Sequence, residues 1–322
     1  MERSRSPGLP FPYLSEPAII SVMRPVLALM ITALALSASD LKIDHVTLAG
    51  AHLDSMREAF TAATGIPTEY GGPHANHVTE MALASFPDGS YPELMGILRE
   101  ADPAAVASHT WSQFLRNDGG PCAFALRVAD VNAEIERLKR AGIHVGTAEK
   151  SGRTGPDGVA LSWETADVGQ GPRGSFFPFL IRDFTPRENR AYPSGKPTTM
   201  RFIGLVVIGV HDLEASTAQY EKAFDLLAPR RQRDEAFGAN LAWFEGSPVV
   251  LAAPMTPDSW LARRIAPYGN SPCAFVLTTT GGMTGHKASN WFGHPITWVG
   301  DVNLGWRWRF PPIRPSQIRR AS

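Results

Sequence analysis

The stretch that decides the fold is Ile43-Asp44-His45-Val46-Thr47-Leu48-Ala49-Gly50. Successive side chains of a β-strand point to opposite faces, so this stretch predicts a strand with His45 and Thr47 on one face. Asp44, Val46 and Leu48 are expected on the other face. A histidine near the start of an apolar strand is a candidate reactive group, and the rest of the chain is arranged around it.

A helix and a hairpin follow this strand. Apolar residues three and four positions apart predict an amphipathic helix that begins near Leu53 and ends at Gly65. Residues 77–86 and 91–98 are typical of two strands, and the Pro-Asp-Gly-Ser turn at 87–90 joins them. The unit therefore has the order strand, helix, strand, strand, and its last strand carries a carboxylate, Glu93.

The same order recurs along the chain. A second copy is predicted from 121 to 183, with an edge or a bulge at Pro178, a third from 202 to 252, and a fourth, damaged copy from 271 to 310. Gly50-Ala51-His52 is repeated as Gly209-Val210-His211, and Pro121-Cys-Ala-Phe124 as Pro272-Cys-Ala-Phe275. The repeats indicate two pairs of units, the second pair being a decayed copy of the first.

Composition narrows the class of protein. The chain has 322 residues, 43% of them hydrophobic and 19% charged, which is typical of a globular protein. Its 31 basic and 31 acidic residues give no positive surplus, which argues against nucleic acid or an anionic membrane as a partner. The basic cluster at 230–233 and the tail at 314–322 are expected to be solvated surface. Cys122 and Cys273 are expected to be buried free thiols, although export would permit a disulfide.

The N-terminal segment predicts export. Met23-Arg24 precedes an apolar run of about 14 residues that ends in small residues near Ala38, as in a secretory signal peptide. We therefore expect a signal peptide at 23–39, a non-native extension at 1–22, and a periplasmic or secreted mature protein. A membrane anchor is the alternative, but the run is shorter than the ~20 residues that span a bilayer.

The order of the units and several short motifs resemble one superfamily. The motifs are Asp44-His45-Val46, Gly71-Gly72-Pro73-His74, the run from Asp88 to Leu94, the strand from Cys122 to Val128, and Phe177 to Ile181 running into Arg187-Glu-Asn-Arg190. They are similar to the vicinal oxygen chelate superfamily, also called the glyoxalase/bleomycin-resistance/dioxygenase superfamily, and within it to the glyoxalase-like domain proteins.

This resemblance implies an α+β fold in which tandem βαβββ modules close into cups with helices outside. The glyoxalase-like domain of two modules is expected at 41–192, a linker at 193–200 and a second, degenerate half at 201–313. The cup of this superfamily holds a divalent metal, which here would be Zn, Fe, Mn or Ni. The resemblance implies that His45 and Glu93 occupy the positions of two of the metal ligands.

The residues themselves support only part of a metal site. A carboxylate lies four positions after the turn glycine in the first unit, as Glu93, whereas the second and third units have Pro178 and Val250 there. Alignment on the Gly-x-His repeat places Gly204 opposite His45. Two protein ligands bind a metal weakly, so His74, Asn76 and His77 are the candidates to complete the site.

Two kinds of function follow from these residues. His45 and Glu93 are the expected catalytic pair of a lyase, isomerase or dioxygenase, acting on a small oxygenated molecule as metal ligands or as acid and base. His74, His77, Tyr91 and Arg127 are the expected substrate-binding residues. The alternative is a metal-free protein that binds a small molecule without catalysis. A scaffold or a homodimer that pairs through the tryptophan-rich segment 291–308 is also left open.

Overall fold

The computed structural model describes residues 41–155, 157–187, 200–235, 237–279, 288–291 and 294–298. All of them belong to one compact unit, Ser37–Ser322, and the other unit, Met1–Leu36, lies outside the described residues. The predicted extension at 1–22, the signal peptide at 23–39, most of the linker and the basic tail therefore lie outside the described residues as well. In the part of the chain that the structure describes, no helix is long and apolar enough to cross a membrane.

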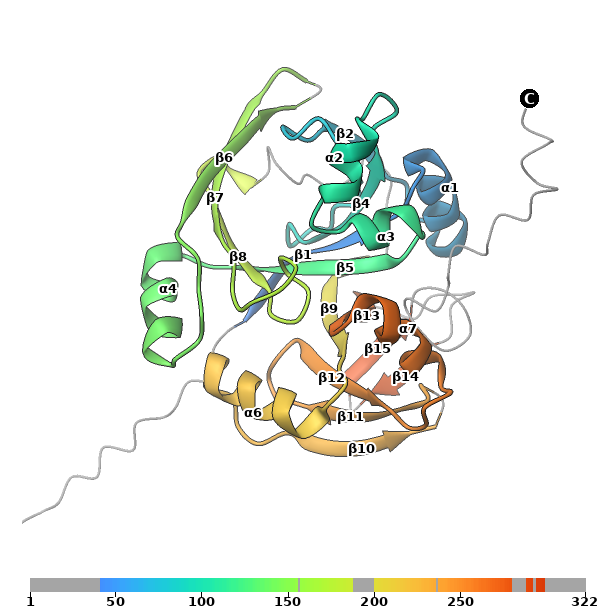
Figure 1. Cartoon of the computed structure of the whole chain (residues 1–322), viewed down its shortest axis with the longest axis vertical. Coiled ribbons are helices and arrows are strands. Elements are labelled where there is room, and N and C mark those ends of the chain that lie inside the picture. Colours follow the sequence, from blue (N-terminus) through green and yellow to red (C-terminus); the bar gives the residue numbers. More distant parts are fainter. Residues whose placement is uncertain are drawn as a thin grey trace, which may run out of the picture. The chain divides into compact units, whose positions relative to one another are not determined.

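The N-terminal sheet has the strand order β2-β3-β4-β1-β5-β8-β7-β6 and curls around the site (Figure 1). Its strands are β1 (Lys42–Ala49), β2 (Glu69–Pro73), β3 (Thr79–Leu83), β4 (Tyr91–Ile97), β5 (Gly120–Arg127), β6 (Glu149–Thr154), β7 (Ala160–Ala166) and β8 (Phe179–Asp183). Strand β1 runs parallel to β4 and antiparallel to β5, and β5 runs parallel to β8. The sheet therefore joins two βαβββ units through β1 and β5.

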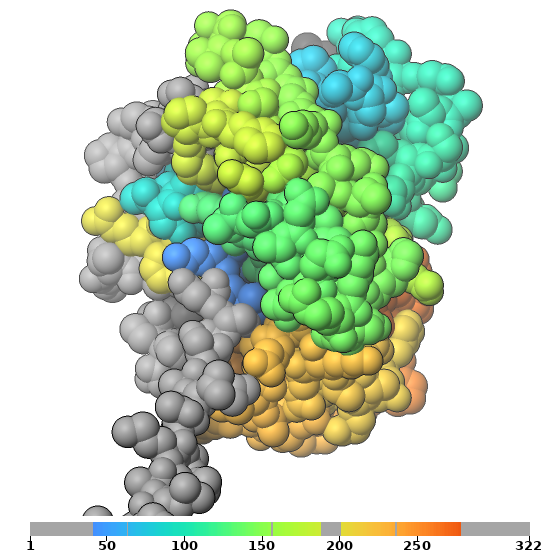
Figure 2. All heavy atoms as spheres, turned by 90° about the vertical axis from the view of Figure 1, so that its left-hand side faces the viewer, coloured from blue at the N-terminus to red at the C-terminus, as the bar shows by residue number. Residues whose placement is uncertain are grey.

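Two longer helices cover the outside of this sheet. Helix α1 (Leu53–Thr64) packs on β3 and β4 through its buried apolar face, and Gly65 ends it in the left-handed conformation, as the sequence predicts. Helix α4 (Val131–Arg140) packs on β7 and β8. Figure 2 shows α4 and the β6–β7 hairpin, both in green, forming the surface on that side. Two short helices, α2 (Pro103–Ser108) and α3 (Ser112–Arg116), precede β5.

The C-terminal sheet repeats the same plan, with the strand order β10-β11-β12-β9-β13-β15-β14. Its strands are β9 (Met200–Gly209), β10 (Arg230–Asp234), β11 (Ala239–Trp243), β12 (Val249–Pro254), β13 (Ser271–Thr279), β14 (Ala288–Trp291) and β15 (His294–Trp298), and its helices are α6 (Leu213–Phe224) and α7 (Trp260–Tyr268). Strand β9 pairs parallel with β12 and antiparallel with β13, as β1 pairs with β4 and β5. The predicted α+β fold of tandem βαβββ modules is confirmed.

Details of the sequence interpretation need correction. Pro178 comes directly before β8, and this strand lies between β5 and β7 instead of at an edge. The expected last strand, from Trp298 to Phe310, lies outside the described residues apart from Trp298. Cys122 and Cys273 are buried free thiols, as predicted.

A β-bulge in β1 changes the face of Asp44. Ile43 pairs with Leu126 and His45 with Ala125, so Asp44 is an extra residue without a partner on β5. A bulge of this kind interrupts the alternation of side chains and re-aims them. The Asp44 side chain consequently reaches the ring of His45, whereas strict alternation had assigned the two residues to opposite faces.

Strand β9 carries a bulge at the equivalent place. Leu205 pairs with Val276 and Ile203 with Leu277, which leaves Gly204 as the extra residue. The counterpart of Asp44 is therefore Gly204, and the counterpart of His45 is Leu205. The alignment that placed Gly204 opposite His45 was therefore wrong by one residue. The amide of Gly50 bonds to Met95 of β4, and the equivalent bond to Ala252 of β12 comes from the amide of Val210. The Gly-x-His repeat had instead matched Gly50 with Gly209.

The two sheets share one hydrophobic core, to which residues from both halves contribute. Arg264 of α7 connects them further: its Nη1 donates to the carbonyl oxygen of Gly119 at 2.7 Å and its Nη2 to that of Pro121 at 2.6 Å. The same Nη2 lies 2.8 Å from the carbonyl oxygen of Pro272. These contacts hold the start of β5 beside β13.

Candidate active site

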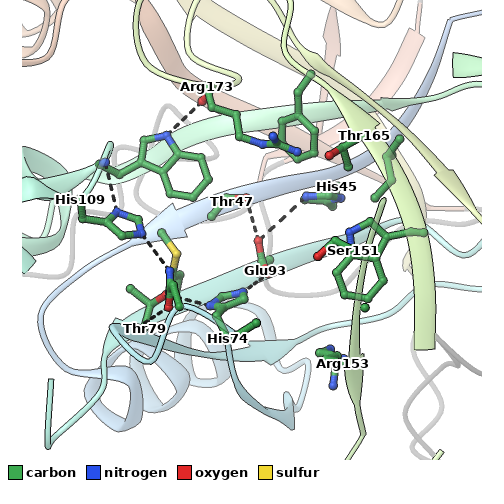
Figure 3. A pocket seen from close by; sticks show the side chains of 18 of the residues that line it. His45, Thr47, His74, Thr79, Glu93, His109, Ser151, Arg153, Thr165 and Arg173 are labelled. Atoms are coloured by element: carbon green, nitrogen blue, oxygen red, sulfur yellow. Dashed lines mark hydrogen bonds and ion pairs between the residues drawn. The ribbon is translucent and has the colours of Figure 1, made fainter. Parts of the chain in front are cut away.

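A cavity of about 270 Å³ lies inside the curl of the N-terminal sheet (Figure 3). Its polar lining comes from His45, Thr47, His74, Asn76, Thr79, Glu93, His109, Ser151, Arg153, Thr165 and Arg173. Four aromatic side chains complete the walls, namely Tyr91, Trp111, Trp163 and Phe179. The cavity is small and concave with a few convergent polar groups, which is typical of a small-molecule site.

Glu93 of β4 is a buried, ionised carboxylate at the bottom of this cavity. Thr47 of β1 donates a hydrogen bond of 2.8 Å to its Oε2, and His74 Nε2 lies 3.3 Å from its Oε1. Burial by itself raises the pKa of Glu93. Other effects outweigh burial and lower the pKa to about 2, namely the hydrogen bond and charge of His74, the charge of His45 and the hydrogen bond from Thr47. Glu93 is therefore a hydrogen-bond acceptor at neutral pH.

His45 lies next to Glu93, with its Nε2 4.0 Å from Glu93 Oε2. Its other nitrogen, Nδ1, is 2.6 Å from Asp44 Oδ1, and Asp44 is fully buried. Because a carboxylate accepts a hydrogen bond, Nδ1 donates its proton to Asp44, and Nε2 is the nitrogen that lines the cavity beside Glu93.

Two arginines hold Asp44 in place. Arg187 Nη1 lies 2.9 Å from Asp44 Oδ2, and Arg127 Nε lies 3.2 Å from the same oxygen. Burial lowers the pKa of Arg187, but nearby groups outweigh this effect and raise the pKa above its ordinary value. The largest of these contributions is the charge of Asp44. The aspartate that orients His45 is thus paired on both oxygens, as a buried charge requires.

Aromatic contacts fix the plane of the His45 ring. Tyr91 stacks on it with ring centroids 4.9 Å apart and an interplanar angle of 6°. Phe179 meets it edge-on at 5.3 Å, and the Arg187 guanidinium lies over the Tyr91 ring, 5.2 Å from its centroid. His45 is therefore held by Asp44 in the plane of its ring and by Tyr91 across its face.

His74 and His109 extend the polar lining toward the rim of the cavity. His74 Nδ1 lies 2.8 Å from the hydroxyl of Thr79, and His109 Nε2 lies 3.3 Å from the Asn76 amide. Burial, with the charge of His74 second, lowers the pKa of His109. Both histidines thus belong to the polar network of Asn76, Thr79 and Glu93.

The predicted site residues fall into two groups. The structure brings His45, Glu93, His74 and Tyr91 together in the cavity. His77 is exposed in the turn before β3, with a positive φ of 54°, outside the lining residues. Arg127, at the end of β5, contacts Asp44 and the carbonyl oxygen of Asp88 instead of the cavity. The structure therefore places His77 and Arg127 outside the lining residues, and their role in substrate binding stays a prediction.

Sequence reasoning did not assign Thr47, His109, Trp111 or Arg173 to the site. Thr47 could have been assigned to the site from the sequence, because the alternation of the strand places it on the same face as His45. Asn76, which lines the cavity, had been named only as a candidate metal ligand. The others lie in loops or next to short helices, where no periodicity shows direction, and tertiary contacts alone bring them to the cavity.

The side chains that face the cup do not fit a complete metal centre. Across the residues that the structure describes, no group of three or more histidine, cysteine, aspartate or glutamate side chains is arranged to hold a metal ion. Strand β5 places Ala125 opposite His45, and β8 contributes Phe179 and Ile181 to the cavity lining; the side chains of these residues have no metal-binding atoms. Strands β5 and β8 therefore supply no further metal ligand to the expected pair His45 and Glu93.

Comparison with known proteins identifies the class. Two curled sheets of βαβββ units with a polar cup define the vicinal oxygen chelate fold. The crystal structure of a hypothetical protein from Staphylococcus aureus matches with a TM-score of 0.55 and 15% identity, covering 79% of this chain and 97% of that chain. A mutant of 4-hydroxymandelate synthase from Streptomyces coelicolor matches with a TM-score of 0.50 and 12% identity, covering 74% and 70%.

The family follows from the sequence match. The model of the glyoxalase-like domain family matches residues 43–224, which is more than half of the chain, and the protein belongs to this family. The match includes both N-terminal modules and extends through α6 of the C-terminal half. No curated protein matches the chain in sequence. At these low identities the solved structures establish the fold alone.

Proposed function

We propose that the N-terminal cup binds a small oxygenated molecule and that His45 acts on it as a general base. One observation carries this proposal: His45 presents Nε2 to a polar cavity while its Nδ1 is bound to a buried, doubly paired Asp44. A carboxylate that orients an imidazole and stabilises its protonated form is the arrangement that makes histidine an effective base.

The proposed step is a proton transfer from carbon. His45 Nε2 forms an N–H bond as the C–H bond next to a carbonyl group breaks, and the electron pair moves to the carbonyl oxygen to give an enolate. Asp44 stabilises the imidazolium, and the proton then returns to carbon or to a leaving group. An isomerase or a lyase follows from this step. Glu93, with its pKa of about 2, accepts hydrogen bonds from the substrate and attracts the imidazolium, but it is too weak a base to take the proton.

Hydrogen–deuterium exchange in D₂O tests this function. Small ketones, aldehydes and 2-oxo acids are incubated with the protein, and loss of the signal of the proton next to the carbonyl group is followed by NMR. General-base catalysis contributes about 10²- to 10⁴-fold, so His45→Gln is expected to lose at least about 100-fold in exchange rate. His211→Gln is the matched control, because His211 is an exposed histidine of the other half. Equal rates for the wild type and His45→Gln would contradict the proposal.

Binding without catalysis is the second candidate, and two observations favour it. Both oxygens of Glu93 already have partners, and strands β5 and β8 contribute the apolar side chains of Ala125, Phe179 and Ile181 on the side of His45. A protein of this kind would bind compounds from the panel with equal affinity in the wild type and in His45→Gln, and neither would exchange the proton.

The role of a metal is tested separately. We propose no step through a metal, so exchange is expected to be unchanged by a chelator and by added Zn²⁺, Mn²⁺, Fe²⁺ or Ni²⁺. Stoichiometric metal in protein purified without a histidine tag, lost in His45→Ala, would instead support the metal-dependent form of the enzyme.

We also propose that the protein is exported through the segment 23–39. The support is the apolar run after Met23-Arg24 and the small residues that follow it. Mass spectrometry of the protein from its native host is expected to find a mature N-terminus near Ser39 or Asp40. An N-terminus that remains at Met1 or Met23 would refute cleavage.

A further inference from the structure

We propose that the substrate of the cup is a small monocarboxylate whose carboxylate group binds the Nε–Nη2 edge of Arg173. This inference rests on the proposed function, because it names the substrate class of the same cavity. It assigns a binding role to a residue that neither the sequence pattern nor the His45–Glu93 pair had indicated.

Arg173 lines the cavity with part of its hydrogen-bonding capacity unused. Its Nη1 donates to Asp167 Oδ1 at 2.6 Å, while Nε and Nη2 have no partner among the described residues. These two nitrogens lie along one edge of the guanidinium plane, and such an edge matches the two oxygens of a carboxylate. Asp167 is half exposed and holds the opposite side, so it positions the guanidinium without occupying this edge.

The backbone around Arg173 is fixed before any ligand binds. The indole Nε1 of Trp111 donates to the Arg173 carbonyl oxygen at 3.0 Å, and the amide of Phe124 donates to the Gly174 carbonyl oxygen at 3.0 Å. Gly174 has a positive φ of 68°, and a Cβ there would lie 2.8 Å from the Cβ of Ala123. The loop therefore sits directly on β5, and a preorganised cation binds an anion at a lower entropic cost.

An aromatic surface connects Arg173 to His45. The Arg173 guanidinium lies 4.1 Å over the ring of Phe179, and the centroid of the same ring lies 5.3 Å from that of His45. Trp111 and Trp163 line the cavity as well. A carboxylate on Arg173 would thus place an apolar or aromatic body along Phe179, with the adjacent carbons within reach of His45 Nε2.

Glu93 restricts the substrate to a single carboxylate. Its buried Oε2 accepts a hydrogen bond from Thr47 at 2.8 Å and lies 4.0 Å from His45 Nε2, so a second carboxylate of the ligand would face acceptor oxygens in a poorly solvated place. A hydroxyl group at that end would instead donate a hydrogen bond to Glu93. The cavity therefore has a cationic end that selects a carboxylate and an anionic end that excludes another one.

Calorimetric titration with matched pairs of compounds tests this assignment. The carboxylates are benzoate and phenylacetate, the neutral isosteres are benzamide and phenylacetamide, and phenylsuccinate is the dicarboxylate. The wild type is expected to bind each monocarboxylate at least about tenfold more tightly than its amide, since a charge-assisted bidentate pair is involved. Phenylsuccinate is expected to bind more weakly than phenylacetate.

The variant Arg173→Gln is expected to bind acid and amide equally. Arg182→Gln is the matched control, because Arg182 also pairs with a carboxylate and lies over a phenylalanine ring, but outside the cavity lining. It should keep the preference for acids. Thermal melting of both variants shows that the fold is intact.

The outcomes separate this inference from the proposed function. Equal affinity of the wild type for acids and amides, no binding of acids at millimolar concentration, or an undiminished preference in Arg173→Gln overturns the monocarboxylate assignment. His45-dependent exchange of neutral ketones would then still support the proposed function. Conversely, acid binding that depends on Arg173, without exchange that depends on His45, supports the substrate class and overturns the catalytic role.

Discussion

The two halves of this protein carry the same bulge with different side chains. In β1 the bulge holds Asp44 and His45, and in β9 it holds Gly204 and Leu205. The register around each bulge is the same, including the pairing of the following leucine or isoleucine with Pro121 or Pro272. The backbone distortion therefore belongs to the fold itself, and the reactive groups depend on which residues occupy it.

The surroundings of the bulges differ in the same way. Thr47 pairs with Glu93 across β1 and β4, whereas Val207 pairs with Val250 across β9 and β12. Leu205, Val207 and Val250 belong to the hydrophobic core. One half thus directs polar groups into a cavity, and the other half uses the equivalent positions for stability.

The largest expected effect comes from transferring the reactive pair to the second half. The double change Gly204→Asp and Leu205→His would introduce a buried aspartate, and the core would lose Leu205. This aspartate would not have the cation that Arg127 gives to Asp44, because the residue at the equivalent position of β13 is Thr278. An uncompensated buried charge costs roughly 3–5 kcal/mol, so chemical denaturation should show a loss of this order. The reverse change, Asp44→Gly with His45→Leu, should abolish exchange and also lower stability, because Arg127 and Arg187 lose their shared carboxylate. A stable transplanted variant would contradict the account of the two bulges.

The ionised Glu93 is expected to make stability depend on acid. The pKa of Glu93 falls from 4.5 to about 2 on folding, so its stabilising contribution is complete above pH 4.5 and is lost as the pH falls toward 2. Its size is about 3 kcal/mol, since one pKa unit corresponds to 1.36 kcal/mol. Urea unfolding across this pH range, compared between the wild type and Glu93→Gln, measures the difference. Val250→Thr in the other half is the control, and it should leave the pH dependence unchanged.

The orienting role of Asp44 gives a smaller effect. Asp44→Asn keeps the shape of the side chain but removes the charge that holds Nδ1–H and stabilises the imidazolium, so exchange should slow by at least about 100-fold, within the range of general-base catalysis. Binding of the ligand should change little, because Asp44 does not line the cavity. An unchanged rate constant with weakened binding would show that Asp44 acts on the ligand instead of on His45.

Much of the fold was predictable from sequence because its central strands and longer helices have clear periodicity. Among the missed strands are β2, β6 and β10, which have the sequences Glu-Tyr-Gly-Gly-Pro, Glu-Lys-Ser-Gly-Arg-Thr and Arg-Arg-Gln-Arg-Asp. Each lies at the edge of a sheet, where side chains are largely exposed and apolar alternation is not required. The short helices α2, α3 and α7 were missed as well, since one or two turns give little periodicity.

The candidate site was predictable where it depends on paired strands. His45 and Glu93 were identified because a strand pattern and a turn fix the faces of both residues. The bulge at Asp44 could not be read from alternation, because it depends on the register with β5. Arg173 and His109 come from segments distant in sequence, and only the packing of Trp111 against the 173–175 loop brings them to the cavity.

Chemical rescue tests the central claim, that His45 of the N-terminal cup is the base, most directly. His45→Ala leaves a space beside Tyr91 that free imidazole can fill, and Leu205→Ala creates the matching space in the other half. Exchange of the proton next to the carbonyl group is measured in both variants with increasing imidazole. The account predicts that His45→Ala is inactive and regains exchange with saturation in imidazole, while Leu205→Ala keeps its activity and does not respond. Wild-type exchange in His45→Ala without imidazole would contradict it.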